Sequence, residues 1–292
     1  MWQSIENAIT QAGGQPFIIQ RRSTIGGGCI NQAFLLAGNQ QRYFVKLNHA
    51  DSLAMFEAEQ AGLQAIIDSA TIKAPQPLCS GVAGNRAFLV MSYIDSTGGT
   101  SNPAALGEQL AAMHQQRFNY FGWQQHNTIG STPQLNPPTQ HWVDFWRTQR
   151  LGFQLKLAAQ NGFGGSLQSE GEQLMVALDG LFDGYTAQPS LLHGDLWSGN
   201  YCFAHDGTPV IFDPACYYGD RETDMAMTEL FGGFNHAFYR AYQNSYPLDS
   251  GYQTRKTLYN LYHILNHLNL FGSGYLSQSE QMIRQLLSEL GK

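Results

Sequence analysis

One polar loop between two apolar runs constrains this chain most. The sequence HGDLWSGN at residues 193–200 follows an apolar run and leads into a short strand-like return at 201–203. A turn at residues 206–207 (Asp-Gly) and a second apolar run at 209–212 then deliver Asp213. Turn-forming residues between two short apolar runs are typical of a β-hairpin. The two arms of this hairpin therefore carry two carboxylates and an amide.

The spacing of these three side chains indicates phosphoryl transfer. Asn200 follows Asp195 by five positions, which is the offset of the catalytic Asp and the metal-binding Asn in the protein-kinase catalytic loop. Asp213 then stands where a second metal-binding carboxylate belongs. Such a reaction needs a carboxylate to orient the attacking hydroxyl and oxygen ligands to hold magnesium. The alternative is a hairpin whose Asp and Asn only cap turns.

A glycine run near the N-terminus adds a second candidate site. Gly26, Gly27 and Gly28 lie between expected strands at 17–22 and 32–36, and a third strand at 42–47 contains Lys46. Backbone without side chains can lie over a triphosphate and offer its N–H groups, although an ordinary hairpin loop has the same composition. Lys46 favours the phosphate-binding interpretation, provided that a carboxylate holds its ammonium group in place.

The helix expected at residues 51–70 supplies two candidate carboxylates for Lys46. Glu57 and Glu59 are two positions apart and project in nearly opposite directions from a helix, so only one can face Lys46. Helical geometry alone leaves the choice between them open.

The small β-rich part is expected to end near residue 95. Strands at 76–82 and 86–94 complete it, and Met91, Ser92, Tyr93 and Ile94 form its exit, where backbone groups could bind adenine. Turn formers at 95–103 make a linker. We therefore predict a nucleotide-binding lobe at 1–95 and a mainly helical lobe at 96–292.

Within the second lobe the pattern predicts helices separated by one long irregular stretch. That stretch covers residues 118–140. The expected helices include 103–116, 140–159, 167–185 and one that starts at Met225 with Asp224 as its cap.

Composition narrows the partners and the compartment. The 292 residues carry a net charge of −6 without a basic cluster, which argues against nucleic acid as a partner. The four cysteines form no Cys-x-x-Cys pair, and the first residues lack a basic and apolar secretory pattern. No stretch is long and apolar enough to predict a membrane-spanning helix. We therefore expect a cytoplasmic protein that does not associate with membranes.

Taken together, the motifs resemble those of the fructosamine kinase (ketosamine-3-kinase) family, which is a branch of the aminoglycoside-phosphotransferase and choline-kinase-like fold. The segments that carry the resemblance are residues 26–31, 44–46, 55–59, 121–123, 130–136, 142–145, 150–151, 193–200, 213–222 and 224–234. Trp197 in the loop and the sequences YYGDRE and LFGGF at 217–222 and 230–234 are the most specific of them.

The resemblance implies an α+β, two-lobed, protein-kinase-like fold, with a small antiparallel β-sheet lobe and a larger mainly helical lobe. It implies ATP and Mg²⁺ as cofactors and phosphorylation of the sugar 3-hydroxyl of a fructosamine or ribulosamine, free or bound to protein. The 3-phosphate then breaks down and releases the amine, which reverses glycation.

The resemblance also implies roles for single residues. Asp195 is the expected catalytic base, and Asn200 and Asp213 are the expected magnesium ligands. Lys46 is expected to contact phosphates while Glu59, rather than Glu57, braces it.

Further expectations concern the substrate and redox control. Trp197 is expected to lie against the sugar, with anchoring between lobes as the alternative. Cys29 matches a cysteine that makes many family members redox-sensitive through intermolecular disulfides. The resemblance therefore implies a monomer or a redox-linked dimer. The alternative is that Cys29 is simply a small residue that the loop tolerates. Asp220 either meets a cationic substrate or belongs to a fixed turn.

Other functions remain open at this stage. A kinase of the same fold could act on an aminoglycoside-like or choline-like alcohol, and a non-catalytic nucleotide-binding protein is a further alternative. Asp-Pro-Ala at 213–215 replaces the Asp-Phe-Gly of protein kinases, and no activation-loop motif is evident.

Overall fold

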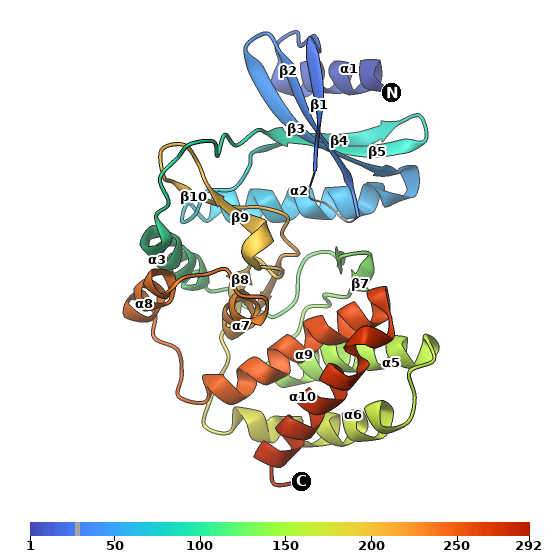
Figure 1. Cartoon of the computed structure of the whole chain (residues 1–292), viewed down its shortest axis with the longest axis vertical. Helices are drawn as coiled ribbons and strands as arrows, with labels where there is room; N and C mark the ends of the chain where they lie inside the picture. The colour runs from blue at the N-terminus through green and yellow to red at the C-terminus, as the bar shows by residue number, and fades with distance from the viewer. Residues whose placement is uncertain (27–29) are drawn as a thin grey trace.

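The structure is a computed structural model that describes residues 1–26 and 30–292. A small lobe built on an antiparallel sheet lies above a larger, mainly helical lobe (Figure 1). The sheet order is β1-β2-β3-β5-β4, so the predicted antiparallel meander of the first three strands is confirmed. The strands are β1 (Arg21–Ile25), β2 (Gln32–Gly38), β3 (Gln41–His49), β4 (Pro77–Ala83) and β5 (Arg86–Ser92).

Helices cover both faces of this sheet. Helix α1 (Trp2–Gly13) packs on one face, and α2 (Leu53–Asp68), which follows the short helix η1 (Ala50–Ser52), packs on the other (Figure 1). The central residues of strand β5, 87–91, are all apolar because both faces of the strand are covered. Phe88 and Val90 join the core beneath α1, whereas Leu89 and Met91 join the core that contains α2. Successive side chains of a strand point to opposite faces, so a strand covered on both sides has no polar positions.

The first strand begins later than predicted. The prediction of a strand at 17–22 was wrong at its start, because side chains of α1 take up the backbone there. The N–H of Phe17 donates to Thr10 Oγ1 at 3.0 Å, and that of Ile19 donates to Glu6 Oε2 at 2.7 Å. The segment before Arg21 therefore ties α1 to the sheet instead of extending the strand.

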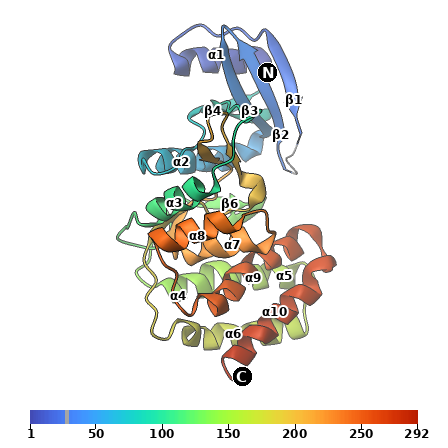
Figure 2. The same ribbon diagram turned by 60° about the vertical axis from the view of Figure 1, so that its left-hand side comes forward.

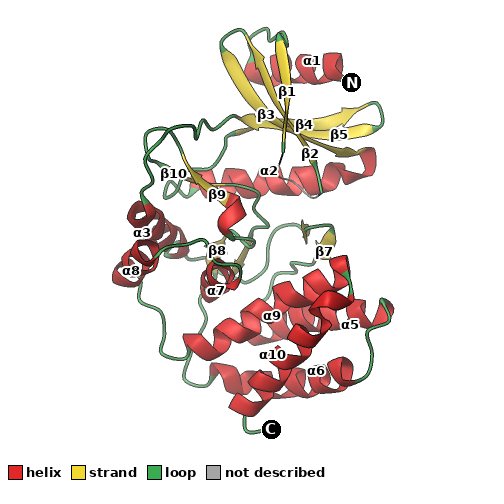
Figure 3. Ribbon diagram, in the orientation of Figure 1, coloured by secondary structure: helices red, strands yellow, loops and turns green. Residues whose placement is uncertain are grey.

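The larger lobe is mainly helical, as predicted. In chain order its elements are α3 (Pro103–His114), β6 (Asn127–Ile129), β7 (Thr132–Gln134), α4 (Trp142–Phe145), η2 (Trp146–Leu151), α5 (Gly152–Gln160), α6 (Ser166–Ala177), η3 (Leu178–Phe182), β8 (Ser190–Leu192), η4 (Ser198–Asn200), β9 (Tyr201–Phe203), β10 (Pro209–Ile211), β11 (Tyr217–Gly219), α7 (Glu222–Leu230), α8 (His236–Ser245), α9 (Tyr252–Phe271), η5 (Ser273–Tyr275) and α10 (Leu276–Glu289). Figure 3 shows that helices make up most of this lobe and that its strands are short.

Two predicted segments differ in detail. The stretch 118–140, expected to be irregular, contains the short hairpin of β6 and β7. The helix expected at 140–159 is interrupted by the π-helical turn η2. The wider turn contains Arg150, whose buried guanidinium donates to Leu135 O and Asn136 Oδ1, both at 2.7 Å. A π-helical turn within a helix commonly serves to place a side chain in this way.

A continuous apolar core joins the two lobes. Phe56 and Leu63 of α2 belong to the same buried cluster as Leu110 of α3 and Leu192 of β8. The predicted division at residue 95 falls between β5 and α3, and it stays a prediction because this core crosses it. Within the described residues, no helix combines the length and the apolar character needed to cross a membrane.

A close approach of two helices in the larger lobe is testable. A Cβ on Gly107 of α3 would lie 2.3 Å from the carbonyl oxygen of Phe238 in α8. We expect Gly107→Ala to lower the free energy of unfolding by about 1–3 kcal/mol, because backbone atoms cannot move aside as a side chain can.

Urea unfolding measures this effect, and Gly13→Ala in α1 is the matched control. There an added Cβ meets only Tyr43 Oη, at 3.9 Å, and we expect unchanged or slightly higher stability. Equal unfolding midpoints for both variants would contradict the close packing of α3 and α8.

Candidate active site

The predicted hairpin places Asp195, Asn200 and Asp213 between the lobes. Strands β9 and β10 pair antiparallel, with Asn200 just before the first and Asp213 two residues after the second. Figures 1 and 2 both show this hairpin between the small lobe and α7. Asn200 Nδ2 donates to the backbone oxygen of Asp195 at 2.8 Å and to its Oδ2 at 3.2 Å. The amide therefore fixes the orientation of the Asp195 carboxylate.

A buried histidine connects the two acidic positions. His193 Nε2 lies 2.9 Å from the carbonyl oxygen of Phe212, and its Nδ1 lies 3.2 Å from the backbone nitrogen of Asp195. These contacts fit a neutral ring with the proton on Nε2, and burial lowers the pKa of His193 accordingly. The N–H of Phe212 also donates to Asn200 O at 3.0 Å. The residues beside Asp195 and Asp213 are thus tied to one another.

Asp224 holds the loop at residues 193–200 in place and was not recognised from the sequence as a residue of the site. Helix α7 starts at Glu222, so the prediction that Asp224 caps a helix beginning at Met225 was wrong. Instead its carboxylate accepts the N–H groups of His193 at 2.7 Å and Gly194 at 2.8 Å. It also lies 3.1 Å from His114 Nε2. Burial alone would raise the pKa of Asp224, but these partners bring it below its usual value.

Lys46 reaches the hairpin from the opposite lobe. Its ammonium nitrogen lies 2.6 Å from Glu59 Oε1 and 2.6 Å from Asp213 Oδ1, whereas Glu57 points to solvent. Burial alone would lower the pKa of Lys46, but the two carboxylates raise it above its usual value, so the side chain is charged. Helix α2 is held in place for this contact because Gly62 packs directly on Cys216, three residues after Asp213.

The chemistry of these donors fits a cation and phosphates. Burial, followed by the charge of Asp213, raises the pKa of Asp195 to about 7. Two neighbouring carboxylates that repel each other favour a bound cation between them. Asp213 also has a left-handed backbone with φ of 58°, a conformation that is uncommon outside glycine and is found at ligand-binding positions. Among the described residues, no group of three or more His, Cys, Asp and Glu side chains could hold a metal by itself, so further ligands would have to come from elsewhere.

Glycines shape the loop around Trp197. A Cβ on Gly199 would lie 2.3 Å from the indole ring of Trp197, and one on Gly194 would lie 2.2 Å from the carbonyl oxygen of Ala215. The absence of a side chain at Gly199 lets the indole fold back over its own loop. Trp197 nevertheless remains 38% exposed, and it lies two residues after Asp195 in the chain.

The remaining nucleotide-site predictions lie on the small lobe. Gly26 is exposed just after β1, whereas the predictions for Gly27, Gly28 and Cys29 lie outside the described residues. Met91 and Ser92 end β5, and Tyr93 and Ile94 follow it. The N–H of Ser92 donates to Gln76 O, and the N–H of Tyr93 donates to Arg42 O. These two N–H groups are therefore already used and would not be the ones that bind an adenine base.

Asp220 belongs to a buried network. Its side chain is 0% exposed and accepts hydrogen bonds from Tyr185 Oη at 2.9 Å and Tyr259 Oη at 2.6 Å. The N–H of Glu222 donates to it as well, at 3.0 Å. These contacts occupy both carboxylate oxygens of Asp220 within the buried turn, which favours the alternative that it belongs to a fixed turn.

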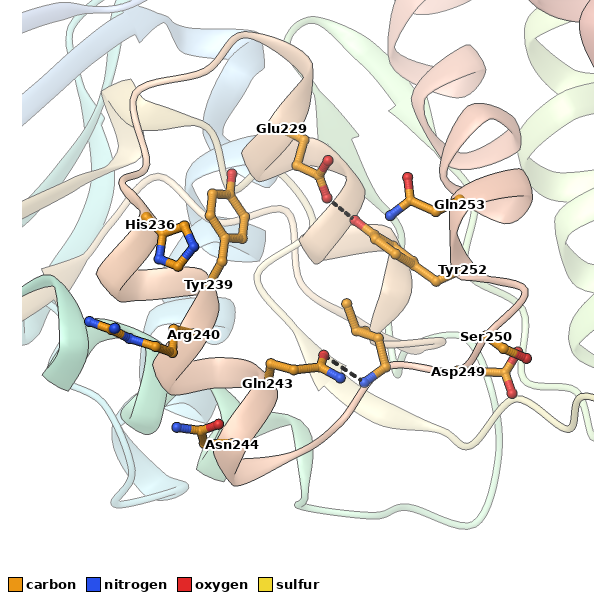
Figure 4. Close-up of a pocket in the computed structure, with 11 residues that line it drawn as sticks. Glu229, His236, Tyr239, Arg240, Gln243, Asn244, Asp249, Ser250, Tyr252 and Gln253 are labelled. Carbon is orange, nitrogen blue, oxygen red and sulfur yellow. Dashed lines mark hydrogen bonds between the residues drawn. The ribbon is translucent and has the colours of Figure 1, made fainter.

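A pocket of about 720 Å³ lies on the α8 side of the larger lobe (Figure 4). None of the candidate phosphoryl-transfer residues lines it. Its carboxylate Glu229 accepts hydrogen bonds from Tyr252 Oη at 2.6 Å and Lys256 Nζ at 2.7 Å, so its charge is already compensated. Gln243 Oε1 likewise accepts the N–H of Leu248 at 3.0 Å.

Comparison with known sequences gives one consistent result. Residues 1–289 match the family model described as fructosamine kinase. A protein of Synechocystis sp. (strain ATCC 27184 / PCC 6803 / Kazusa), named a probable ketoamine kinase, is 48% identical over 288 residues, which cover 98% of this chain and 97% of that protein. A chloroplastic protein-ribulosamine 3-kinase of Arabidopsis thaliana is 41% identical over 95% of this chain and 86% of its own length.

Comparison with solved structures supports the fold. A protein of Haemophilus somnus 129PT, provisionally named fructosamine-3-kinase, has a TM-score of 0.89 and 28% identity over 98% of each chain. Aminoglycoside phosphotransferase APH(4)-Ia, in a complex with ADP and hygromycin B, has a TM-score of 0.62 and 15% identity over 98% of each chain. At that identity the likeness shows the fold alone. The predicted α+β, two-lobed, kinase-like fold is therefore confirmed.

The role of Asp224 can be tested by an isosteric change. Asp224→Asn would turn an amide N–H₂ toward a backbone N–H and would remove the charge that both loop N–H groups share. We expect a loss of about 1–3 kcal/mol in the free energy of unfolding, together with reduced kinase activity.

Urea unfolding and a kinase assay measure the two effects. Asp144→Asn is the matched control, because Asp144 is a 63% exposed partner of Arg147 on the surface and should change stability by less than about 0.5 kcal/mol. An Asp224→Asn protein as stable and active as the control would contradict the positioning role.

Proposed function

The chain belongs to the fructosamine kinase family, and on that basis we propose that it transfers a phosphoryl group from ATP to the sugar 3-hydroxyl of a ketosamine. Family and relatives make it a phosphotransferase that acts on an alcohol group. The observation that carries the proposal is the meeting of Lys46 from the small lobe with Asp213 at 2.6 Å, beside Asp195 in the larger lobe.

Asp195 is the proposed general base. A base works best when its pKa lies near the operating pH, and burial with the charge of Asp213 raises the pKa of Asp195 to about 7. Asn200 fixes one carboxylate oxygen through its hydrogen bond at 3.2 Å. The other oxygen of Asp195 then accepts the proton of the sugar hydroxyl. The hydroxyl oxygen forms a bond to the terminal phosphorus of ATP, and the bond between that phosphorus and ADP breaks.

Asn200 and Asp213 are the proposed ligands of Mg²⁺, which when bound with ATP supplies positive charge to the phosphate oxygens. An amide oxygen and a carboxylate are hard oxygen donors of the kind that Mg²⁺ prefers. Lys46 is placed to contact the phosphates through its charged ammonium group, while Glu59 keeps it oriented. The backbone near Gly26 and the segment Met91–Ile94 are the proposed nucleotide contacts of the small lobe.

Trp197 is the proposed platform for the sugar. An indole face suits the C–H groups of a sugar ring, and the ring is half-exposed two residues after the proposed base. A named relative is a protein-ribulosamine 3-kinase, so a protein-bound ketosamine is included in the proposed substrate class. Breakdown of the 3-phosphate would release the amine and so reverse glycation. A cytoplasmic location and a monomer or redox-linked dimer through Cys29 stay predictions.

The first test removes the proposed base. Asp195→Asn keeps the shape of the side chain but cannot accept a proton, so we expect a loss of about 10²- to 10⁴-fold in kcat with a ribulosamine, with nucleotide affinity largely kept. Coupled ADP release measures turnover, and titration calorimetry measures nucleotide binding.

Asp206→Asn, at the tip of the same hairpin, is the control and should act like the unmodified protein. Its carboxylate only accepts the N–H of Thr208, at 3.0 Å. Full turnover by the Asp195→Asn protein would remove that residue from the role of base.

A second test concerns the metal. Chelation of divalent cations should abolish turnover, and added Mg²⁺ should restore it. Asp213→Asn should raise the Mg²⁺ concentration needed for half-maximal activity by about 10-fold or more, because a charged ligand is lost. The magnesium dependence of ADP release measures both effects, with Asp206→Asn again as the control. Unchanged turnover in excess chelator would rule out the metal.

A further inference from the structure

Exposed aromatic side chains lie beside the catalytic loop. Trp197, Phe231 and Phe271 keep 38%, 44% and 60% of their surface exposed. Side chains of this size are usually buried in a chain that has a large core, and neighbouring exposed ones mark a surface for binding.

Contacts arrange these side chains in one row. A Cβ on Gly233 would lie 2.3 Å from the Cβ of Ser198, so the loop that carries Phe231 packs on the loop that carries Trp197. The Oη of Tyr201 also donates to Gly233 O, at 3.0 Å.

From Phe231 the row continues onto the end of α9. The ring of His267 lies 5.3 Å from that of Phe231, and the rings of Phe271 and Tyr275 lie 5.4 Å and 5.2 Å from His267. We call Trp197, Phe231, His267, Phe271 and Tyr275 the aromatic row.

The aromatic row ends beneath the small lobe. Ile30 of the small lobe is 42% exposed. It borders the same glycine as Leu270, which is the neighbour of Phe271 in the chain. A Cβ on that glycine, Gly130, would lie 3.4 Å from Ile30 Cδ1 and 3.0 Å from Leu270 Cδ1. The row therefore runs from the loop at 193–200 to the place where the two lobes meet, and we call this side of the site the rim.

Charge is missing from the segments that build this rim. The sequence has no Asp, Glu, Lys or Arg from residue 257 to 279, from 230 to 235 or from 118 to 143. These segments contain the last turns of α9, the loop after α7 and the β6–β7 hairpin. A ligand that carries a charge would lose hydration on this rim without gaining a counter-ion, whereas an apolar ligand would gain from burial.

We propose that the aromatic row beyond Trp197, from Phe231 to Tyr275, binds the amine carrier of the ketosamine and selects an uncharged alkyl chain of several carbons. The inference rests on the proposed function. A ketosamine has two parts, the sugar and the carrier on its nitrogen. With the sugar hydroxyl at Asp195 and the sugar ring against Trp197, the exposed side chain of Phe231, on the loop that packs against the Trp197 loop, is available to the carrier. The methylene chain of a glycated lysine has the required chemistry.

Alkyl contacts on this rim form when the substrate binds and stay the same in the transition state. They should therefore lower KM and leave kcat unchanged. Burial of one methylene group on a half-open surface favours binding by about 2-fold. We expect the longer carriers to be distinguished through KM.

The test is a substrate series with one sugar and different carriers. Ribulosamines of methylamine, hexylamine and 1,6-diaminohexane share the reacting hydroxyl, and the last carries a positive charge at the far end of the chain. For the unmodified protein we expect kcat/KM for the hexylamine adduct, which is five methylene groups longer, to exceed that for the methylamine adduct by about 30-fold, through KM. The diamine adduct should fall below the hexylamine adduct.

Variants then locate the effect. Phe231→Ser and Phe271→Ser should each reduce the hexylamine-to-methylamine ratio of kcat/KM by about 3-fold. Val176→Ser removes an apolar side chain that is 84% exposed on α6, at the far end of the larger lobe, and should leave that ratio unchanged (Figure 1).

Each contrary result has a definite meaning. Equal kcat/KM for the methylamine and hexylamine adducts would overturn the inference while leaving the proposed function intact. Preference for the diamine adduct would also overturn it, since the rim would then favour a cationic carrier. A protein that phosphorylates none of the three adducts, yet binds ATP, would overturn both proposals.

Discussion

The two ion pairs of Lys46 are the contacts on which the arrangement of the site depends. A buried ammonium group is tolerated only where carboxylates compensate for its lost hydration. One of these carboxylates, Glu59, comes from the same lobe, and the other, Asp213, comes from the opposite lobe, each at 2.6 Å. The ammonium group of one small-lobe side chain thus contacts carboxylates of both lobes at the place where the lobes meet. That meeting place is the hairpin that carries the acidic residues.

A second buried charge organises the same hairpin from the other side. Asp224 accepts two backbone N–H groups just before Asp195, so the loop cannot shift without leaving a buried carboxylate unpaired. Phosphoryl transfer depends on positioning and charge more than on covalent chemistry of the protein. Asp224 fixes the loop just before Asp195, and Lys46 pairs with Asp213 on the other arm of the hairpin, so both arms are held in place. In our proposal the neighbouring aromatic row binds the carrier, so the carrier and the phosphates are bound by different parts of the site.

Local patterns were sufficient for much of the fold. The meander of β1, β2 and β3 followed from apolar runs separated by turn residues, which act over a few positions. The prediction of a strand at 17–22 was wrong at its start because Thr10 and Glu6 of α1 bind the backbone there. A helix side chain that takes the place of a neighbouring strand leaves no pattern in the sequence of the strand itself. The π-helical turn around Arg150 was missed for a similar reason, since the groups that hold its guanidinium belong to another segment.

The sequence by itself determined which residue types stand on the two arms of the hairpin, because the spacing of Asp195, Asn200 and Asp213 is a short-range property. Helical periodicity left Glu57 and Glu59 open, because it gives the angle between two side chains but not the direction of the helix. The family resemblance favoured Glu59, and the tertiary structure shows that Glu59 contacts Lys46. Only the tertiary structure decided the role of Asp224. The backbone groups that it binds lie 31 and 30 positions away in the chain, and no local pattern reports a contact across that separation.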